Sequence, residues 1–86
     1  MHFIYNLHLN NNTLYTGCTN NIKRRISEHK NGLVQSTKNR HPKLIHYEAY
    51  QLSSDAIRRE KYLKTTEGKK MLRKQIKNLL EVLLKK

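Results

Sequence analysis

The chain has 86 residues, which is enough for one small domain with a modest core. Its 18 lysines and arginines stand against 6 acidic residues, and the formal net charge of +12 favours a polyanionic partner over charge that serves only solubility. One cysteine excludes an intrachain disulfide and no apolar run approaches the roughly 20 residues of a membrane span, so we expect a cytoplasmic protein without a membrane partner.

Residues 2–9 and 13–18 are predicted to be the two strands of a hairpin, because both are rich in strand-forming residues. The turn between them contains Asn10, Asn11 and Asn12, and asparagine tolerates the left-handed conformation that tight turns require.

The length of this turn decides where Tyr5 and Tyr15 point. With a two-residue turn, the two rings lie on opposite faces of the sheet. With a three-residue turn, Tyr5 pairs with Gly17 and Tyr15 with Leu7, and both rings project from one face. A site shared by the tyrosines therefore needs an odd turn or a bulge. The hairpin alone is more typical of two ordinary strand tyrosines than of a shared site.

A helix is predicted over residues 21–31, with a polar cap before it and Gly32 as its stop. The helical period places Arg25 and His29 on one edge of the apolar stripe, one turn apart, and points Arg24 into solvent. Arg25 is also consistent with a structural ion pair, and His29 with a surface histidine near a helix C-terminus.

After a basic, polar loop at residues 33–42, residues 43–50 are predicted to form the third strand. Strict alternation puts its even-numbered residues on one side: Leu44, His46, Glu48 and Tyr50.

A second helix is predicted from residue 53 to about residue 64, and it contains an anomalous carboxylate. The helical period puts Glu60 inside the apolar stripe, where a carboxylate is costly unless a cation or hydrogen bonds accompany it. Glu60 therefore either pairs with a cation such as Arg25 or Arg59, or binds a metal ion.

Residues 66–86 are predicted to form a third, amphipathic and basic helix with a leucine-rich stripe. Such a helix could lie on a membrane surface, but the small domain needs core material, so we expect it to pack on the sheet. The predicted fold is α/β, of the α+β type, in one domain spanning residues 1–86: a three-stranded antiparallel sheet flanked by about three helices.

Five short motifs, in order along residues 3–65, resemble the GIY-YIG nuclease family. They are Phe3-Ile4-Tyr5 in place of GIY, Tyr15-Thr16-Gly17 in place of YIG, the run from Cys18 to His29, Arg40-His41-Pro42 with the strand ending Tyr47-Glu48, and the run from Ala56 to Lys61. The chain looks most like the small stand-alone bacterial members, which are related to the N-terminal domain of the excision nuclease. Phe3 and Thr16 depart from the name motif, and the asparagine that some members carry after the glutamate has no clear counterpart.

The resemblance implies a catalytic role for five residues: Tyr5, Tyr15, Arg25, His29 and Glu60. Glu60 would hold one divalent metal ion, Mg²⁺ or Mn²⁺, and Arg25 would neutralise the scissile phosphate. The tyrosines would position or deprotonate the water with help from His29, and Gly17 would let the backbone approach closely.

The sequence therefore predicts a metal-dependent endonuclease, or the catalytic module of one, that hydrolyses DNA, including the branched or damaged DNA of repair. Residues 1–65 carry 11 basic and 4 acidic side chains and residues 66–86 carry 7 and 2, so the positive excess extends along the whole chain. Phosphate contacts are expected from basic residues on the helices and the 33–42 loop: Lys23, Arg24, Lys38, Arg40, Lys43 and Arg59. Without a base-reading module, a specific target would have to come from a protein partner. The alternative is a module that binds DNA or RNA with little or no cleavage.

Overall fold

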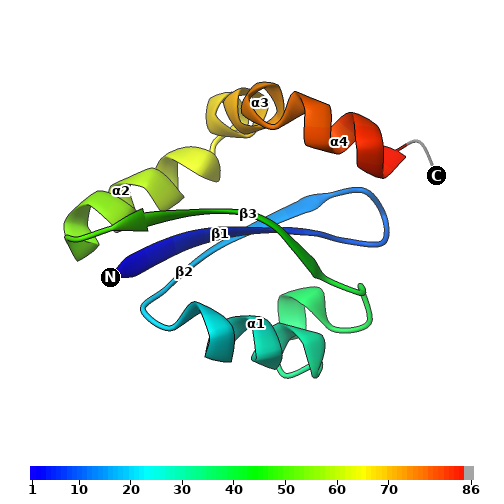
Figure 1. Ribbon diagram of the computed structural model, residues 1–86, viewed down its shortest axis with the longest axis horizontal. Coiled ribbons are helices and arrows are strands. Elements are labelled where there is room, and N and C mark those ends of the chain that lie inside the picture. Colours follow the sequence, from blue (N-terminus) through cyan, green and yellow to red (C-terminus); the bar gives the residue numbers. More distant parts are fainter. Residues whose placement is uncertain (85–86) are drawn as a thin grey trace.

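The computed structural model, which describes residues 1–84, places three strands between two layers of helices (Figure 1). The elements follow in the order β1 (His2–His8), β2 (Leu14–Thr19), α1 (Ile22–Lys30), the short 3₁₀ helix η1 (Gln35–Thr37), β3 (Lys43–Tyr50), α2 (Ser53–Leu63), α3 (Thr66–Gln75) and α4 (Lys77–Leu84). The strands form one antiparallel sheet in the order β2-β1-β3. Helix α1 covers one face and α2 to α4 cover the other, which confirms the predicted α+β fold.

The hairpin turn has three residues, as a site shared by the two tyrosines requires. Leu9 N–H donates to the Thr13 carbonyl at 3.0 Å, and the turn residue Asn12 has a positive φ of 64°. Asparagine adopts this left-handed conformation more readily than most residues. Gly17 lies opposite Tyr5 in the resulting register, so the tyrosine rings project from the same face.

A β-bulge in β3 makes the predicted strict alternation wrong. Asn6 pairs with His46, but the next pair is Leu7 with Leu44, so Ile45 is the extra residue. Leu44 therefore packs beside Leu7 on the α1 side of the sheet, while Ile45 packs against the apolar cluster under α2 to α4. Alternation can predict the existence of a strand, but not the position at which a bulge reverses it.

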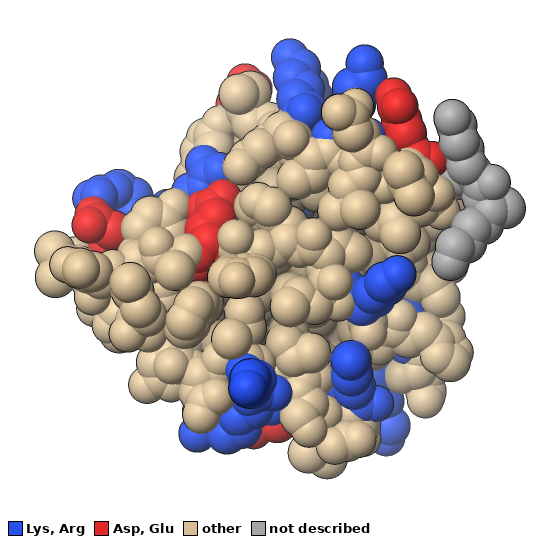
Figure 2. All heavy atoms as spheres, viewed as in Figure 1, with Lys and Arg blue, Asp and Glu red and all other residues tan. Residues whose placement is uncertain are grey.

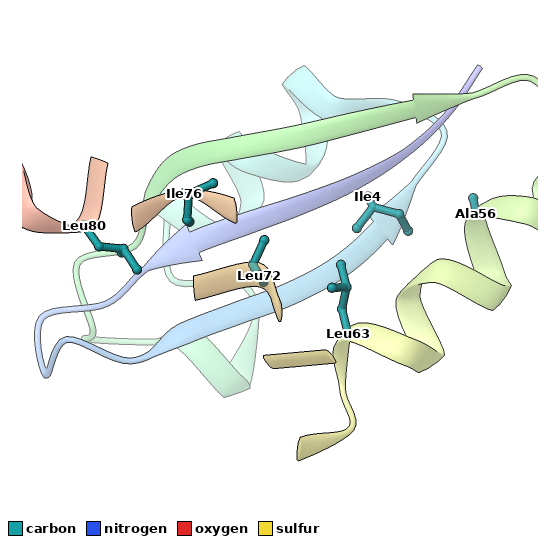
Figure 3. Close-up of a cluster of buried hydrophobic side chains, with 6 residues drawn as sticks. All are labelled: Ile4, Ala56, Leu63, Leu72, Ile76 and Leu80. Atoms are coloured by element: carbon teal, nitrogen blue, oxygen red, sulfur yellow. The ribbon is translucent and has the colours of Figure 1, made fainter. Parts of the chain in front are cut away.

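The main core lies between the sheet and the C-terminal helices. Its buried members come from β1, from α2, α3 and α4, and from the junction between α3 and α4. All are drawn in Figure 3: Ile4, Ala56, Leu63, Leu72, Ile76 and Leu80. The burial of Leu72, Ile76 and Leu80 against Ile4 confirms the prediction that the segment after residue 66 packs on the sheet. Within residues 1–84, no helix is long and apolar enough to cross a membrane.

The segment after residue 66 is two helices, where one was predicted. Ile76 leaves the helical conformation, with φ −111° and ψ 31°, between α3 and α4. The break leaves Leu72 and Leu80 in the same buried cluster as Ile4. The predicted continuation of the helix through residues 85 and 86 lies outside the described residues.

A buried polar row crosses all three strands on the α2 side. Asn6 is fully buried, and its Oδ1 accepts from the Thr16 hydroxyl at 2.7 Å, while its Nδ2 lies 3.1 Å from Nδ1 of His46. A buried amide is costly unless its groups are paired. Slippage of either neighbouring strand would break one of these bonds, so the row helps to fix the register that carries the site.

Candidate active site

On the α1 face of the sheet, one histidine lies between the two hairpin tyrosines. The side chain of Tyr5 is 1% exposed and its hydroxyl lies 2.8 Å from Nε2 of His29, which is also 1% exposed. The His29 ring packs edge-on against both tyrosines, with ring-centroid distances of 5.4 Å to Tyr5 and 5.3 Å to Tyr15. His29 is thus a buried partner of the tyrosines, and the alternative of a surface histidine is wrong.

The other nitrogen of the histidine is held by Thr37, which was not among the predicted site residues. Thr37 belongs to η1 and is fully buried, and its hydroxyl lies 2.7 Å from Nδ1 of His29. Nothing in the polar 33–42 segment indicates that one of its residues turns inward, because the 3₁₀ turn that buries Thr37 has no periodic signal.

The protonation states of His29 and Tyr5 follow from their surroundings. Burial, reinforced by the positive charge of Arg25, lowers the pKa of His29, so its imidazole is neutral near pH 7. Burial also raises the pKa of Tyr5, with the charges of Tyr15 and Glu60 adding to it, although the hydrogen bond from Arg25 opposes the shift. Tyr5 is therefore a neutral phenol.

One tautomer of His29 lets the Tyr5 hydroxyl act as a hydrogen-bond donor. Nε of Arg25 donates to the Tyr5 oxygen at 3.4 Å, and in the part of the chain that the structure describes Nε2 of His29 is the only acceptor bonded to that hydroxyl. When the neutral imidazole carries its proton on Nδ1, the Tyr5 O–H donates to Nε2 and the Nδ1–H donates to Thr37.

Of the two adjacent arginines, Arg25 is the one directed at the site. Its Nη1 also pairs with Glu28 at 3.0 Å, and its side chain stays 35% exposed, so the guanidinium can reach solvent at the mouth of the site. Arg24 is exposed, as the helical period predicted.

Gly17 lies directly against the Tyr5 ring. A Cβ atom built on Gly17 would overlap the hydroxyl and Cζ of Tyr5 and lie 2.8 Å from Cε2. A glycine is therefore required here if Tyr5 is to reach His29, which agrees with the predicted close backbone approach.

Glu60 lies on α2, in the helix layer opposite α1, and its side chain is 23% exposed. It pairs with Lys64 at 3.3 Å, so the predicted partners Arg25 and Arg59 are wrong. Those arginines bind Glu28 and Glu48 instead, because helical periodicity identifies a face but not the cation that reaches it. The charge of Glu60 nevertheless contributes to the raised pKa of both Tyr5 and Cys18.

Comparison with known proteins identifies the family that this arrangement belongs to. The family model described as the GIY-YIG catalytic domain matches residues 1–74. The chain belongs to the GIY-YIG family. The match extends beyond the predicted 3–65 into α3, and it supports a nuclease-type hydrolase at the level of the family.

Its relatives include other small GIY-YIG-type proteins. A UPF0213 protein of Clostridium perfringens is 39% identical over 66 residues, covering 74% of this chain and 71% of its own. Another, of Staphylococcus haemolyticus, is 36% identical over 74 residues, covering 84% and 90%. The solution NMR structure of the UPF0213 protein BH0048 from Bacillus halodurans has a TM-score of 0.54 and 29% identity, over 83% of this chain and 80% of that one.

GIY-YIG nucleases generally use a metal ion. In this protein such an ion would have one carboxylate ligand, that of Glu60. Residues 1–84 contain no group of three or more histidine, cysteine and acidic side chains that could hold an ion on their own. Mg²⁺ usually keeps several waters and takes one or two carboxylates plus substrate phosphates. Partly exposed Glu60 fits such an open site, with Lys64 balancing its charge before an ion binds.

The side chains predicted to contact phosphates differ in how many of their donors are free to bind a phosphate. Lys23, Arg24, Lys38, Arg40 and Lys43 are exposed. Arg59 instead binds both oxygens of Glu48, at 3.0 and 3.1 Å, and Oε1 of Gln75 at 3.3 Å, which leaves its guanidinium fewer donors for phosphate. In the view of Figure 2, lysines and arginines gather at the α1 end and at the α3 end of the molecule.

Proposed function

We propose that this protein is a metal-dependent endonuclease that hydrolyses phosphodiester bonds in DNA, with Tyr5, Tyr15, Arg25, His29 and Glu60 as its catalytic residues. The observation that carries the proposal is the hydrogen-bonded line from Tyr5 through His29 to Thr37. With the imidazole proton on Nδ1, a buried phenol bonded to the neutral Nε2 can pass its proton to the histidine.

Tyr5 acts as a proton relay in this mechanism. Because its pKa is raised, a tyrosinate is not available as a base. As the phenol oxygen takes the proton of the attacking water, its own proton passes to Nε2 of His29, 2.8 Å away. His29 becomes an imidazolium with both nitrogens protonated, and the resulting hydroxide forms the new bond to phosphorus while the bond from phosphorus to the leaving oxygen breaks. The leaving oxygen takes a proton from solvent water, and His29 then releases its proton to the solvent.

Arg25 supplies positive charge where negative charge develops. Its Nε holds the Tyr5 oxygen at 3.4 Å, and its partly exposed guanidinium can donate to a phosphate oxygen at the mouth of the site. The same charge disfavours the imidazolium form before reaction and so keeps His29 ready to accept a proton. Tyr15 packs on the His29 ring and, as the second tyrosine of the pair, would position the attacking water beside Tyr5.

Glu60 would hold the divalent ion, Mg²⁺ or Mn²⁺. Bound there, such an ion stabilises charge on the phosphate oxygens and lowers the pKa of water. Exposed cations on α1 and around the 33–43 segment would contact the DNA backbone without reading sequence, so a protein partner would supply any specific target, such as branched or damaged DNA in repair.

The test is cleavage of labelled branched, nicked and single-stranded DNA, and of RNA, in Mg²⁺ or Mn²⁺. We expect cleavage by the wild-type protein, its loss in EDTA, and a loss of at least about 100-fold in Glu60→Gln, since the carboxylate that holds the ion is gone. Lys61→Gln, one position away and exposed, is the matched control and should keep its activity. Binding of all these nucleic acids without cleavage would instead establish the alternative, a binding module.

A further inference from the structure

A cleft of about 330 Å³ lies beside β2, where the end of α2 and α3 face the strand. It is separate from the cluster of Tyr5 and His29, which lies on the opposite face of the sheet. The floor includes the buried side chains of Leu63 and Leu72, and the rim carries three cations, Lys64, Lys69 and Arg73.

The charge of this cleft has one sign. Of the nine residues that line it, three are basic and none is acidic. Arg73 is oriented by an Nη2 donation to the Asn12 carbonyl at 3.4 Å, and Lys64 is bound to Glu60 at 3.3 Å. A cleft whose lining charges are all positive attracts an anionic chain, because its low-dielectric walls focus the electrostatic field.

The shape of the cleft favours a single strand over a duplex. Its wall is formed by β2, which is an edge strand, so alternate backbone N–H groups point away from β1 and can donate to phosphate oxygens. The cations at the rim suit one sugar-phosphate backbone, whose phosphates they can bind.

Two residues of the cleft link it to groups assigned to catalysis, although the cluster of Tyr5 and His29 lies across β2. Tyr15 is one of its lining residues, and the ring of the same residue packs on His29. Lys64 connects the rim to Glu60. A strand in the cleft therefore runs along β2 from the neighbourhood of Glu60 past Tyr15.

We propose that this cleft holds the single nucleic-acid strand that flanks the scissile bond, with Lys64, Lys69 and Arg73 on successive phosphates. The position of this strand beside a scissile bond rests on the proposed function, but the binding of the strand does not. The contacts recognise the backbone that DNA and RNA share, so the cleft gives affinity and orientation without sequence preference.

The test measures binding of a short fluorescein-labelled single-stranded DNA, and of the matching RNA, by anisotropy in EDTA at several salt concentrations. The test variant is the double substitution Lys69→Gln with Arg73→Gln. Each lost phosphate contact to a single strand reduces the slope of log K against log salt by about 0.7, so this variant should lose about 1.4. The matched control is Lys70→Gln with Lys74→Gln, two exposed cations on α3 that do not line the cleft, and it should keep the wild-type slope.

The result that overturns the proposal is an equal loss of slope in both double variants, or no loss in either. Circular dichroism and melting confirm that each variant is folded, and the single Lys69→Gln, with an expected loss of about 0.7, serves if the double variant is not. Cleavage by the wild-type protein is measured separately. Cleavage without the slope difference refutes the cleft alone, and a slope difference without cleavage refutes the proposed activity alone.

Discussion

At the scale of single residues, the site depends on a histidine held from both sides. Tyr5 and Thr37 bind its two nitrogens at 2.8 and 2.7 Å, and both are buried, so the ring is held in one orientation. Thr37 touches no reacting atom in the proposed mechanism and is therefore a positioning residue.

Thr37→Val tests that positioning role. Valine keeps the size of the side chain but cannot accept from Nδ1, so the tautomer is no longer held and a buried donor is unsatisfied. We expect kcat to fall about tenfold with KM little changed, together with a shift of the pH profile of kcat. Thr37→Ser restores the hydroxyl and should recover most of the rate. A full rate with an unshifted profile in Thr37→Val would contradict the role.

The neutral state of His29 also predicts how stability depends on pH. Because burial lowers its pKa in the folded state, the unfolded chain binds more protons below the ordinary value of about 6.5. The free energy of unfolding should therefore decrease as the pH falls from about 6.5 toward the lowered pKa. Denaturant unfolding at several pH values measures this decrease. The loss should be smaller in His29→Asn, and an equal loss in both proteins would show that His29 is not its source.

At the scale of elements, the corner between α2 and α3 sets the position of the C-terminal layer. Gly68, in the first turns of α3, is buried, and a Cβ atom there would overlap the backbone carbonyl of Tyr62. Helices α2 and α3 are in contact at this corner, which also brings Lys64 and Lys69 to the cleft.

Gly68→Ala is predicted to destabilise the protein, although alanine normally stabilises a helix relative to glycine by about 1 kcal/mol. The added methyl group has to push backbone apart, so we expect the free energy of unfolding to fall by about 1–3 kcal/mol in urea denaturation. Lys70→Ala, on the exposed side of the same helix, should change it by no more than about 0.5 kcal/mol. A stabilised Gly68→Ala protein would contradict the close contact between α2 and α3.

At the scale of the whole molecule, the features with a regular period were predictable from the sequence. Alternation along β1 and β2, with a turn of odd length, places Tyr5 and Tyr15 on one face, and the helical period separates Arg25 from Arg24. The structure confirms both, but only the arginines are decided by local periodicity alone. The tyrosines also needed the turn of odd length, which the sequence left open.

The features that depend on long-range packing were not predictable. Thr37 turns inward in a segment without periodicity, and Ile45 is an extra residue that no alternation pattern reveals. Glu60 was predicted to lie inside the apolar stripe of α2, but its side chain is 23% exposed and its partner is the nearby Lys64. Choosing among several cations requires distances between elements, and a sequence does not contain them.

The measurement that tests the central claim most directly is single-turnover cleavage of a labelled DNA by the matched pair Arg25→Ala and Arg24→Ala. Both variants lose one positive charge from the same helix, but only Arg25 contacts the Tyr5 hydroxyl. We expect Arg25→Ala to lose at least about 100-fold in rate and Arg24→Ala to lose no more than a few-fold, mainly through weaker DNA binding. Equal rates in the two variants would contradict the assignment of the Tyr5–His29 cluster as the active site.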